Sequence, residues 1–384
     1  MAEGKAAGLV ERLWRDPRMH EAVLRLGESL VALAVGLLIG AVILWASGYS
    51  PGEAYYYLFQ SSLLDIYGLS STLSFATPVL LTGLTFAVGV RAGLFNIGAE
   101  GQLYMGALGA MILAWLASSH GVLNSPLGTL VGLLLGALLG AGLALIAAVL
   151  KIYRGVHEVV STIMLNWIAF WLVYYIQSQV LYWHKDATKS IPVPPGARLP
   201  LLVQGTELSA SFLVAIGFTV FTYYLLWHMV HGYELRASGL SPKAARYAGI
   251  SPERGIMLAF LLGGVAAGLA GAGEVMGRPP HYAVTSGLSN LVNLGFDGIT
   301  VALIGANHPL GMIPAAIFIG ALNAGSRAMQ AFAGVPLEVV RIVEGVIIIT
   351  LAVPGVLHMV EEYMRKRREL REIAEREQKA EAQA

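Results

Sequence analysis

The sequence predicts an all-α polytopic membrane protein with about ten transmembrane helices. Hydrophobic residues make up 56% of the 384 residues and charged residues only 13%, about half the charged share of an average soluble domain. The mean hydropathy is +0.66. Several charge-free stretches reach the roughly 20 residues that an α-helix needs to cross a bilayer. A soluble fold is therefore excluded, and the net charge of +1 gives no reason to expect a nucleic-acid partner.

The apolar stretches divide into spans in the following order. The charge-free stretches of sufficient length are 29–52, 66–90, 101–150, 159–183, 208–233 and 255–273. The third is long enough for two helices, which the polar turn 118–126 separates. Beyond Asp297, the apolar piece 298–306 is too short to cross alone, and the pieces 309–322 and about 338–360 follow it. We therefore expect ten spans, of which the eighth and ninth are short or broken.

The distribution of Lys and Arg predicts which side of the membrane each loop faces. Positive charge is concentrated in 1–28, in the loop 231–255 and in the tail, whereas the loops 48–65 and 118–126 have none. Because cytoplasmic loops carry such an excess, we expect an inner (plasma) membrane protein with both termini in the cytoplasm. The predicted parts are a cytoplasmic N-terminal segment, a transmembrane domain and a cytoplasmic charged C-terminal helix, at 1–28, 29–360 and 361–384. The loop 184–207, with three positive charges, departs from this trend.

A six-residue pattern occurs twice in the most apolar part of the sequence. Asn-Ile-Gly-Ala-Glu-Gly occupies 96–101, and Asn-Leu-Gly-Phe-Asp-Gly occupies 293–298. Each copy follows the second span of its half and puts a carboxylate between glycines. Ionisable groups and helix-breaking glycines are costly in lipid, and matched pairs of them mark the centres of transporters built from inverted repeats. We therefore predict two inverted five-helix repeats with broken or half helices.

The polar side chains of the two copies are candidates for a translocation path or a substrate contact, because amides and carboxylates suit hydroxyl-rich solutes. These candidates are Asn96, Glu100, Gln102, Asn293 and Asp297. The glycines are candidates for helix breaks that expose backbone groups to a water-filled path. They are Gly98, Gly101, Gly295 and Gly298. An alternative stays open, in which the polar groups only satisfy loose backbone groups or Glu100 pairs with Arg91.

A short helix with well-defined ends is predicted in the loop 231–255. Ser241 suits the N-cap, Pro242 the first helical position and Gly249 the C-terminal stop. Small side chains should form a flat face, and these are Ala244, Ala245 and Ala248. Polar and aromatic contacts should come from Lys243, Arg246 and Tyr247. Such a helix suits docking into a groove of a cytoplasmic partner, although an ordinary interfacial connector has the same pattern.

Small residues recur at every fourth position of the predicted fourth span. They are Gly132, Gly136, Gly140, Ala144 and Ala148. Such a stripe lets two helix backbones approach closely, and we expect it to pack within the subunit rather than against a second copy. Glu274 and Arg278 are one helical turn apart, and we expect them to form a structural ion pair.

No catalytic or metal-binding constellation is found in the sequence. The stretch His-Glu-Val-Val-Ser at 157–161 has Ser161 where a zinc protease has its second histidine. No phosphate-binding loop of the type G-x-x-x-x-G-K-[ST] occurs, since the Gly-Lys pair Gly4-Lys5 is followed by Ala6. The chain contains no cysteine. We therefore expect neither an enzyme nor a cofactor in this chain, and energy must come from a partner or an ion gradient.

Three stretches carry a resemblance to a known family. They are Arg-Ala-Gly-Leu-Phe-Asn-Ile-Gly-Ala-Glu-Gly-Gln at 91–102, Gly-Phe-Asp-Gly-Ile-Thr-Val-Ala-Leu-Ile-Gly at 295–305 and Ala-Ser-Gly-Leu-Ser-Pro-Lys-Ala-Ala-Arg-Tyr-Ala-Gly-Ile at 237–250. Together they resemble permease subunits of ATP-binding-cassette (ABC) importers, of the nucleoside and simple-sugar type within the superfamily of branched-chain amino acid and ribose permeases. The resemblance extends over about 30–360. One departure is mild: Ser241 stands where many relatives have Asn.

The resemblance implies a ten-span permease domain over 29–360 that carries nucleosides or simple sugars. It also implies three protein partners: a cytoplasmic ABC ATPase that binds ATP and Mg²⁺, a second, related permease and an external substrate-binding lipoprotein. The loop 231–255 would then be the coupling loop that contacts the ATPase. The alternative is a gradient-driven secondary transporter of a small polar solute, in which Glu100 and Asp297 bind protons or Na⁺. A secondary carrier has no need of the capped cytoplasmic helix.

Overall fold

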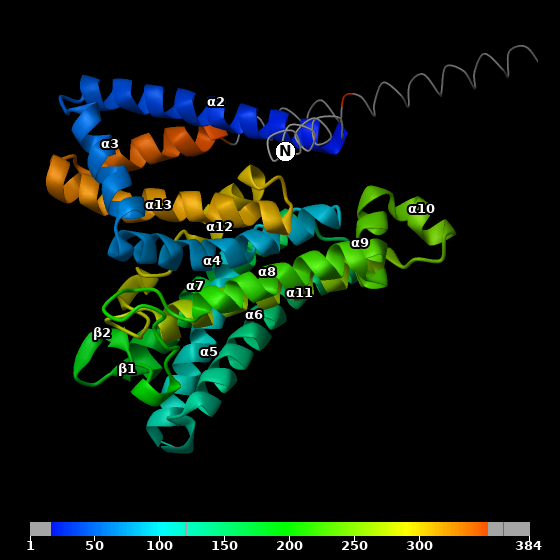
Figure 1. Cartoon of the computed structure of the whole chain (residues 1–384). Coiled ribbons are helices and arrows are strands. Elements are labelled where there is room, and N and C mark those ends of the chain that lie inside the picture. The colour runs from blue at the N-terminus through cyan, green and yellow to red at the C-terminus, as the bar shows by residue number, and fades with distance from the viewer. Residues whose placement is uncertain (1–16, 120, 352–363, 365–384) are drawn as a thin grey trace, which may run out of the picture. The chain divides into compact units, whose positions relative to one another are not determined.

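The computed structural model describes residues 17–119, 121–351 and 364. Of the predicted N-terminal segment 1–28, residues 1–16 lie outside this part, as does the predicted C-terminal helix 361–384 except Met364. Helices dominate the described residues (Figure 1). The chain divides into two compact units, which are Met1–Ala54 with Ala333–Ala384, and Tyr55–Phe332.

Seven helices in the described part of the chain are long and apolar enough to cross a membrane. They are α4 (Ile66–Arg91), α5 (Ala99–Ser119), α6 (Pro126–Arg154), α7 (Glu158–Tyr175) with the π-helix η3 (Ile176–Val180), α8 (Ser211–His228), α11 (Pro252–Gly277) and α13 (Pro309–Ala333). Two shorter apolar helices accompany them, Val31–Ala46 within α2 (Pro17–Ala46), and α12 (Leu294–Ile304). The predicted all-α membrane class agrees with this architecture, while the number of ten spans and the inverted repeat stay predictions.

The connecting elements are short. They are α3 (Pro51–Phe59), the π-helix η1 (Gln60–Leu64), η2 (Gly121–Leu123), η4 (Pro195–Ala197), α9 (Val230–Leu240), α10 (Pro242–Tyr247) and η5 (Ser286–Leu288). Two strands, β1 (Tyr182–Trp183) and β2 (Asp186–Ser190), pair antiparallel in the loop after α7. A helix also covers 337–351, the described part of the predicted last span.

Several predicted spans have different limits in the structure, and the ninth and the sixth are two of them. The ninth, predicted as the short piece 309–322, is the 25-residue helix α13. Its polar side chains do not end the helix, because the Asn323 amide donates to the Ile319 carbonyl and Arg327 reaches the Glu207 carboxylate, 3.9 Å away. The sixth, predicted as 208–233, ends at His228, because Met229 is extended and separates α8 from α9.

In the unit that contains α2, this helix packs against the helix 337–351. A Cβ added at Gly36 would lie 3.0 Å from the Ile347 Cα and 3.3 Å from the Thr350 Cβ. The two backbones approach closely because Gly36 has no side chain.

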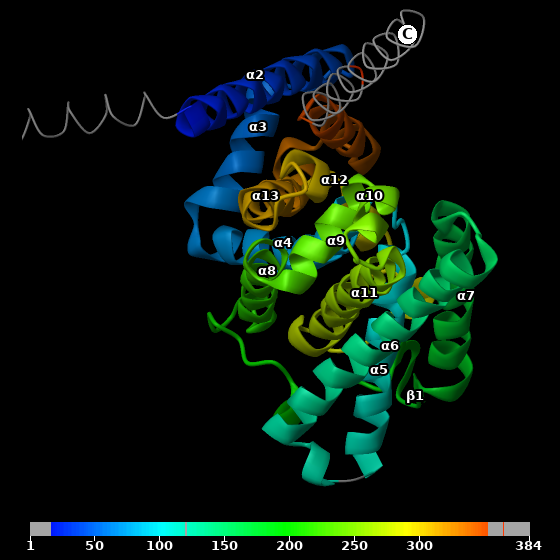
Figure 2. The same ribbon diagram turned by 90° about the vertical axis from the view of Figure 1, so that its right-hand side faces the viewer.

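The core of the unit Tyr55–Phe332 is the crossing of α5, α6 and α11, which Figure 2 shows. Backbones touch there, since a Cβ added at Gly106 would lie 2.1 Å from the Gly268 carbonyl oxygen. Likewise, a Cβ at Gly140 would lie 2.5 Å from the Gly264 carbonyl oxygen. The small-residue stripe of α6 therefore packs within the subunit, as expected from the sequence. Helix α4 packs on α11 and α12 beside this core.

The same unit has two ends that matter for function (Figure 1). At the end we call the α10 end, a Cβ added at Gly239 in α9 would lie 2.3 Å from the Arg91 carbonyl oxygen, where α4 stops. At the other end, which we call the hairpin end, the Ser190 amide of β2 donates to the Val284 carbonyl at 2.8 Å. The Leu199 amide donates there to the Met276 carbonyl, at the end of α11.

Candidate functional site

The two copies of the repeated pattern form the starts of two helices, α5 and α12. The chain has no regular secondary structure at 94–97 after α4, and α5 begins at Ala99. Before α12, Asn293 has a left-handed backbone with φ of 73° and ψ of −8°. The first backbone N–H groups of any helix have no partner within that helix. Each copy must therefore obtain hydrogen-bond acceptors from elsewhere.

Glu100 satisfies the start of α12 from the first turn of α5. One carboxylate oxygen accepts hydrogen bonds from the Asn293 amide and the Tyr104 hydroxyl, each at 2.6 Å. The other accepts from the Gly295 amide, also at 2.6 Å. Glu100 is 3% exposed. A carboxylate at a helix N-terminus is favoured both by these N–H groups and by the helix dipole, so the first copy caps the helix that the second copy begins.

The pattern glycines allow this contact, but three of them do not break a helix as predicted. Gly101 lies in the first turn of α5, and Gly295 and Gly298 lie in the first turns of α12. A Cβ added at Gly295 would lie 2.5 Å from the Glu100 Cα. A Cβ at Gly298 would lie 2.6 Å from the Gly83 amide nitrogen. These residues are glycine because neighbouring backbones occupy the space of a side chain; only Gly98 precedes its helix.

Asn96 and Gln102 point into the protein beside Gly98. The Asn96 side-chain oxygen accepts from the Gly98 backbone amide at 2.9 Å and from the Gln102 side-chain amide at 3.5 Å. Both residues are 1% exposed. The Asn96 side-chain nitrogen and the Gln102 side-chain oxygen have no partner among the described residues. These two candidates therefore shape the start of α5, and their burial removes them from the surface of this chain.

Sequence reasoning missed Asn166 in α7, which fixes the same helix start. Its side-chain oxygen accepts from the Gly101 amide at 2.8 Å, and its side-chain nitrogen donates to the Ile97 carbonyl at 2.9 Å. Asn166 is buried. Asn166 lies in the charge-free stretch 159–183, eleven residues before the next side-chain amide, Gln177. This was the available signal, since polar groups in such segments usually have a specific partner.

The contact between the starts of α5 and α12 lies beside the middle of α4 rather than at its end. The Thr82 hydroxyl of α4 donates to the Leu294 carbonyl at the start of α12, at 2.8 Å. Thr82 lies about 13 Å along α4 from its Arg91 end, at 1.5 Å per residue. The far end of α12 reaches that end of α4, because Arg91 donates to the carbonyls of Ala306 and Asn307. Helix α12 thus runs from the middle of α4 to the α10 end. Arg91 contacts the far end of α12 and is not the partner of Glu100.

Asp297 and Asn293 differ from the three candidates of the first copy. Asn293 is exposed and Asp297 half-buried. Among the described residues, no hydrogen-bond or ion-pair partner of the Asp297 carboxylate is found. The structure therefore brings Glu100 and Asn293 together through the Asn293 backbone. It leaves the Asp297 carboxylate without a partner among the described residues. The two carboxylates that match in sequence have different environments.

At the α10 end, the short helix has the predicted caps. The Ser241 hydroxyl accepts from the Ala244 amide at 3.3 Å, Pro242 begins the helix, and Gly249 has a φ of +78°. The predicted flat face needs correction, because Ala245 is only 4% exposed and packs inward. The exposed side chains are Lys243, Ala244, Arg246, Tyr247 and Ala248. Tyr247, 96% exposed, is the most prominent of them.

Helix α10 and the helix before it are held to the rest of the bundle by two contacts. Arg246 forms an ion pair with Glu253 in the first turn of α11. In α9, which precedes it, an added Cβ at Gly239 would meet the backbone of Arg91. Helix α10 is thus joined to α11 by an ion pair, and α9 before it packs against the end of α4.

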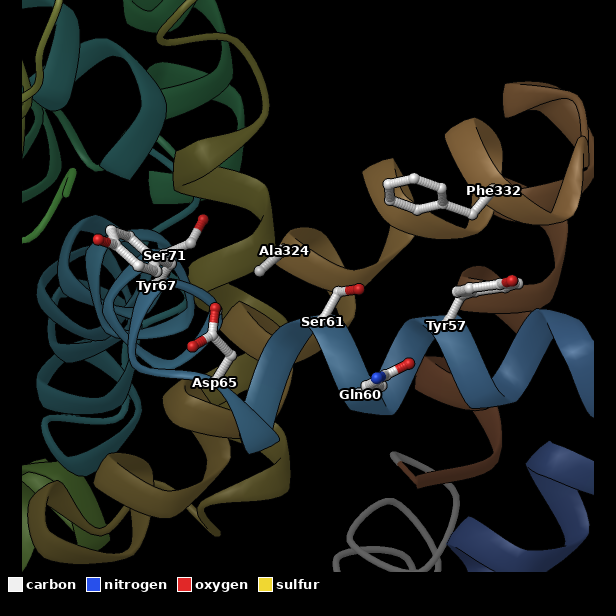
Figure 3. Close-up of a pocket in the computed structure, with 9 residues that line it drawn as sticks. Tyr57, Gln60, Ser61, Asp65, Tyr67, Ser71, Ala324 and Phe332 are labelled. Carbon is white, nitrogen blue, oxygen red and sulfur yellow. The ribbon is translucent and has the colours of Figure 1, made fainter. Parts of the chain in front are cut away.

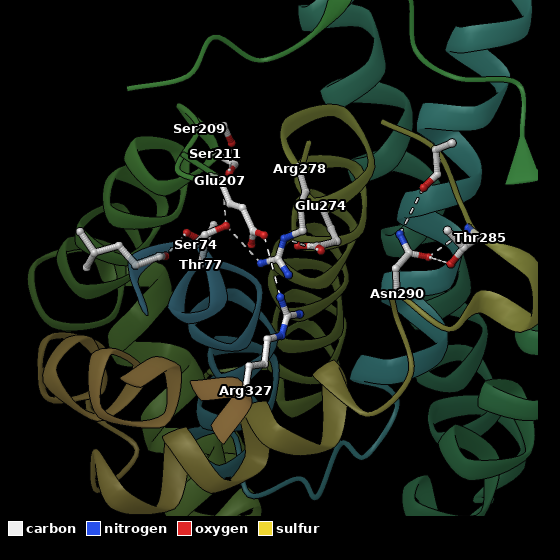
Figure 4. A network of polar contacts seen from close by, with 12 residues as sticks. Ser74, Thr77, Glu207, Ser209, Ser211, Glu274, Arg278, Thr285, Asn290 and Arg327 are labelled. Atoms are coloured by element: carbon white, nitrogen blue, oxygen red, sulfur yellow. Dashed lines mark hydrogen bonds and ion pairs between the residues drawn. The ribbon is translucent and has the colours of Figure 1, made fainter. Parts of the chain in front are cut away.

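Glu274 and Arg278 form the predicted ion pair at the hairpin end, with Nε and Oε1 2.9 Å apart. Figure 4 shows that the pair is part of a larger network of polar contacts. Arg278 donates to the Ser74 hydroxyl at 3.2 Å, and that hydroxyl donates to the Glu207 carbonyl at 3.0 Å. Arg278 also lies over the Phe75 ring, 4.4 Å from its centroid. These contacts tie α4, α11 and the loop before α8 together.

The described residues contain no group of His, Cys, Asp and Glu side chains that could hold a metal ion. Glu158, from the stretch that resembles half a zinc motif, pairs instead with Lys151 at 2.5 Å and accepts from the Phe95 amide. Its role is thus to join α6, α7 and the segment before α5.

The family model described as branched-chain amino acid transport system / permease component matches residues 68–352. The chain is 37% identical over 326 residues to the guanosine ABC transporter permease protein NupP of Bacillus subtilis (strain 168), with 84% of this chain and 92% of that protein covered.

Two further relatives extend the comparison. The glucose ABC transporter permease protein TsgB13 of Haloferax volcanii is 31% identical over 351 residues, or 88% of this chain and 90% of that protein. The guanosine ABC transporter permease protein NupQ of B. subtilis (strain 168) is 26% identical over 267 residues, which cover 65% of this chain and 78% of that protein. No solved structure matches the chain significantly.

Proposed function

Because this chain belongs to the family of branched-chain amino acid transport system permease components, we propose that it forms the translocation path for nucleosides or simple sugars in an ATP-driven importer. The chain is a multi-pass permease component. Nucleosides are the first candidates, since NupP is named for guanosine, while TsgB13, named for glucose, supports sugars. The proposed location is the inner (plasma) membrane, with the α10 end and both termini in the cytoplasm.

The proposed assembly contains a second, related permease, a cytoplasmic ABC ATPase and an external substrate-binding lipoprotein. Support for the second permease comes from B. subtilis, where NupP and NupQ both carry the name guanosine permease and both match this chain. ATP and Mg²⁺ would be bound by the ATPase, because this sequence has no phosphate-binding loop.

The observation that carries the ATP-driven proposal is the geometry of α10. It is capped at both ends, anchored through Arg246 to α11, and presents Tyr247 and small side chains outward. An exposed Tyr on a rigid helix is a typical anchor for a partner groove. The gradient-driven alternative is less well supported, because Glu100 is committed to capping α12. Of the two carboxylates that would bind protons or Na⁺ in that alternative, only Asp297 has no partner among the described residues.

Replacing Tyr247 with Ala should reduce ATP-dependent uptake by about tenfold, equivalent to about 1.4 kcal/mol of docking free energy. The reason is that the side chain contacts nothing that holds this chain together, but fills the proposed ATPase groove. Uptake of a radiolabelled nucleoside into vesicles that contain the whole transporter measures the effect. The melting temperature of the permease should not change.

Tyr153→Ala is the matched control, because Tyr153 is 76% exposed at the C-terminal end of α6 but lies outside α10. It should leave uptake unchanged. Ala245→Arg should instead lower the recovery of folded permease, since Ala245 is buried. Full ATP-dependent uptake by the Tyr247 variant, or uptake by the purified chain alone driven by a proton or Na⁺ gradient, would contradict the proposal.

A further inference from the structure

The capped helix α10 has a counterpart earlier in the chain, at the start of α3. Ser-Pro-Gly-Glu-Ala-Tyr-Tyr at 50–56 matches Ser-Pro-Lys-Ala-Ala-Arg-Tyr at 241–247 in its Ser, Pro, Ala and final Tyr. The Ser50 hydroxyl accepts from the Glu53 amide at 3.4 Å, as the Ser241 hydroxyl does from Ala244 at 3.3 Å. In both elements Pro is the first helical residue.

The matching residues also have matching exposures. Ala54 is 0% exposed and Ala245 4%, so each helix turns its Ala inward. Tyr56 is 58% exposed and Tyr247 96%, so each helix turns its last shared Tyr outward. The shared N-cap and the matching exposures, rather than composition alone, support treating the two helices as equivalent members of the predicted repeat.

The counterpart of α10 leads to the opposite end of the bundle. Helix α3 continues through η1 into the start of α4, and the Thr72 hydroxyl of α4 donates to the Ser62 carbonyl of η1 at 2.7 Å. Ser74, two residues further along α4, accepts a hydrogen bond from Arg278 in the polar network at the hairpin end. In an inverted repeat, the equivalent of a cytoplasmic loop helix lies on the outer side of the membrane. Under the proposed function, η1 and the start of α4 therefore face outward.

The two counterparts carry opposite charge. Residues 47–65 contain Glu53 and Asp65 but neither Lys nor Arg, whereas α10 contains Lys243 and Arg246. Glu53 and Asp65 are both exposed. Charge of one sign on an exposed surface favours a partner surface of the other sign. The segment 47–65 thus favours a partner with a basic surface.

A recess of about 590 Å³ lies beside this segment, between η1, the start of α4 and the end of α13 (Figure 3). Its lining includes Asp65, Gln60 and Tyr67, and the Tyr57 and Phe332 rings, which stack with centroids 5.5 Å apart. No Lys or Arg lines it among the residues that the structure describes. Among the described residues, no ion-pair partner of Asp65 is found. A carboxylate beside aromatic rings suits an Arg or Lys side chain, through charge-assisted hydrogen bonds and cation–π contact.

We propose that α3 and η1 form the docking element for the external substrate-binding protein, which inserts an Arg or Lys side chain into the recess beside Asp65. This inference rests on the proposed function, because it assigns one of that transporter's partners to a named surface. It also assigns a role to each copy of the Ser-Pro helix in the predicted repeat: one contacts the ATPase and the other contacts the binding protein.

The test measures the affinity of the binding protein encoded beside this chain for the whole permease–ATPase complex in lipid nanodiscs. Asp65→Lys should weaken binding at low salt by at least about tenfold, because like charges would face each other. Asp65→Asn should weaken it less. Both effects should shrink as salt rises, since salt screens exposed charges.

Asp186→Asn is the matched control, because this half-buried carboxylate also lies at the hairpin end but is engaged within its own strand. The hydroxyl and amide of Thr188 lower the pKa of the Asp186 carboxyl to about 2, and Lys189 pairs with it at 3.1 Å. The control should bind normally. Co-purification of the ATPase and its basal hydrolysis should be unchanged in all three variants, which shows that they are folded.

Two results would overturn the inference while leaving the proposed function intact. One is unchanged affinity for the binding protein in both Asp65 variants. The other is that the Asp65 variants bind nucleoside or lipid less well than the wild-type complex when the binding protein is absent. That result would make the recess a solute or lipid site. If the wild-type complex did not retain an ATPase, the proposed function would fail first, and the inference with it.

Discussion

Replacing Glu100 with Gln is expected to cost this protein both stability and most of its transport. The carboxylate accepts from the amides of Asn293 and Gly295 and from the Tyr104 hydroxyl, in a site that is almost fully buried. A Gln side chain has one acceptor oxygen, and its NH₂ group would face a hydrogen-bond donor. Hydrogen bonds to a charged group contribute roughly 1.5–3 kcal/mol each, so we expect a loss of at least about 2 kcal/mol.

Thermal unfolding of the purified permease in detergent measures the loss, and vesicle uptake measures transport. Asp297→Asn is the matched control, because it makes the same chemical change at the equivalent position of the second copy. Asp297 has no hydrogen bond to lose among the described residues, so its melting temperature should not change. A fall in uptake in that variant alone would indicate that Asp297 faces the path. Equal melting temperatures for Glu100→Gln and the wild type would contradict the capping role.

Replacing Gly136 with Leu should prevent the permease from assembling. A Cβ at this position would lie 2.6 Å from the Ala272 Cβ and 3.0 Å from the Gly268 carbonyl oxygen, both in α11. Backbone atoms cannot move aside as flexible side chains can, so the three-helix core would have to separate. Overpacking of a core costs roughly 1–3 kcal/mol and occasionally more, and contact with backbone puts this variant at or above about 3 kcal/mol.

Gly142→Leu is the control on the same helix. Gly142 is exposed, and nothing lies within 4 Å of an added Cβ. The yield of monodisperse protein after membrane extraction should fall sharply for Gly136→Leu and remain near wild type for Gly142→Leu. Similar yields for both variants would mean that α5, α6 and α11 do not cross as closely as described. Similar losses would instead indicate that α6 tolerates no large residue on either face.

The features that the sequence determined are local ones. The length and hydropathy of the spans, and the caps of α10 at Ser241, Pro242 and Gly249, depend on residues within a few positions of one another. The spacing of Gly136 and Gly140 likewise predicts close backbone contact, since one turn of helix fixes which side chains share a face. The family also followed from local patterns, because its motifs are continuous stretches of chain.

Tertiary structure alone decided the roles within the repeated pattern. Glu100 and Asp297 match in sequence, but only Glu100 meets the free N–H groups of another helix, which lie in a distant part of the chain. Similarly, Ala245 turns inward, although its neighbours gave no sign of it. A sequence states which groups need partners, and hydrogen-bonding rules state their kind. Which partner each group finds depends on helix packing over the whole chain, and that is why two matching carboxylates came to differ.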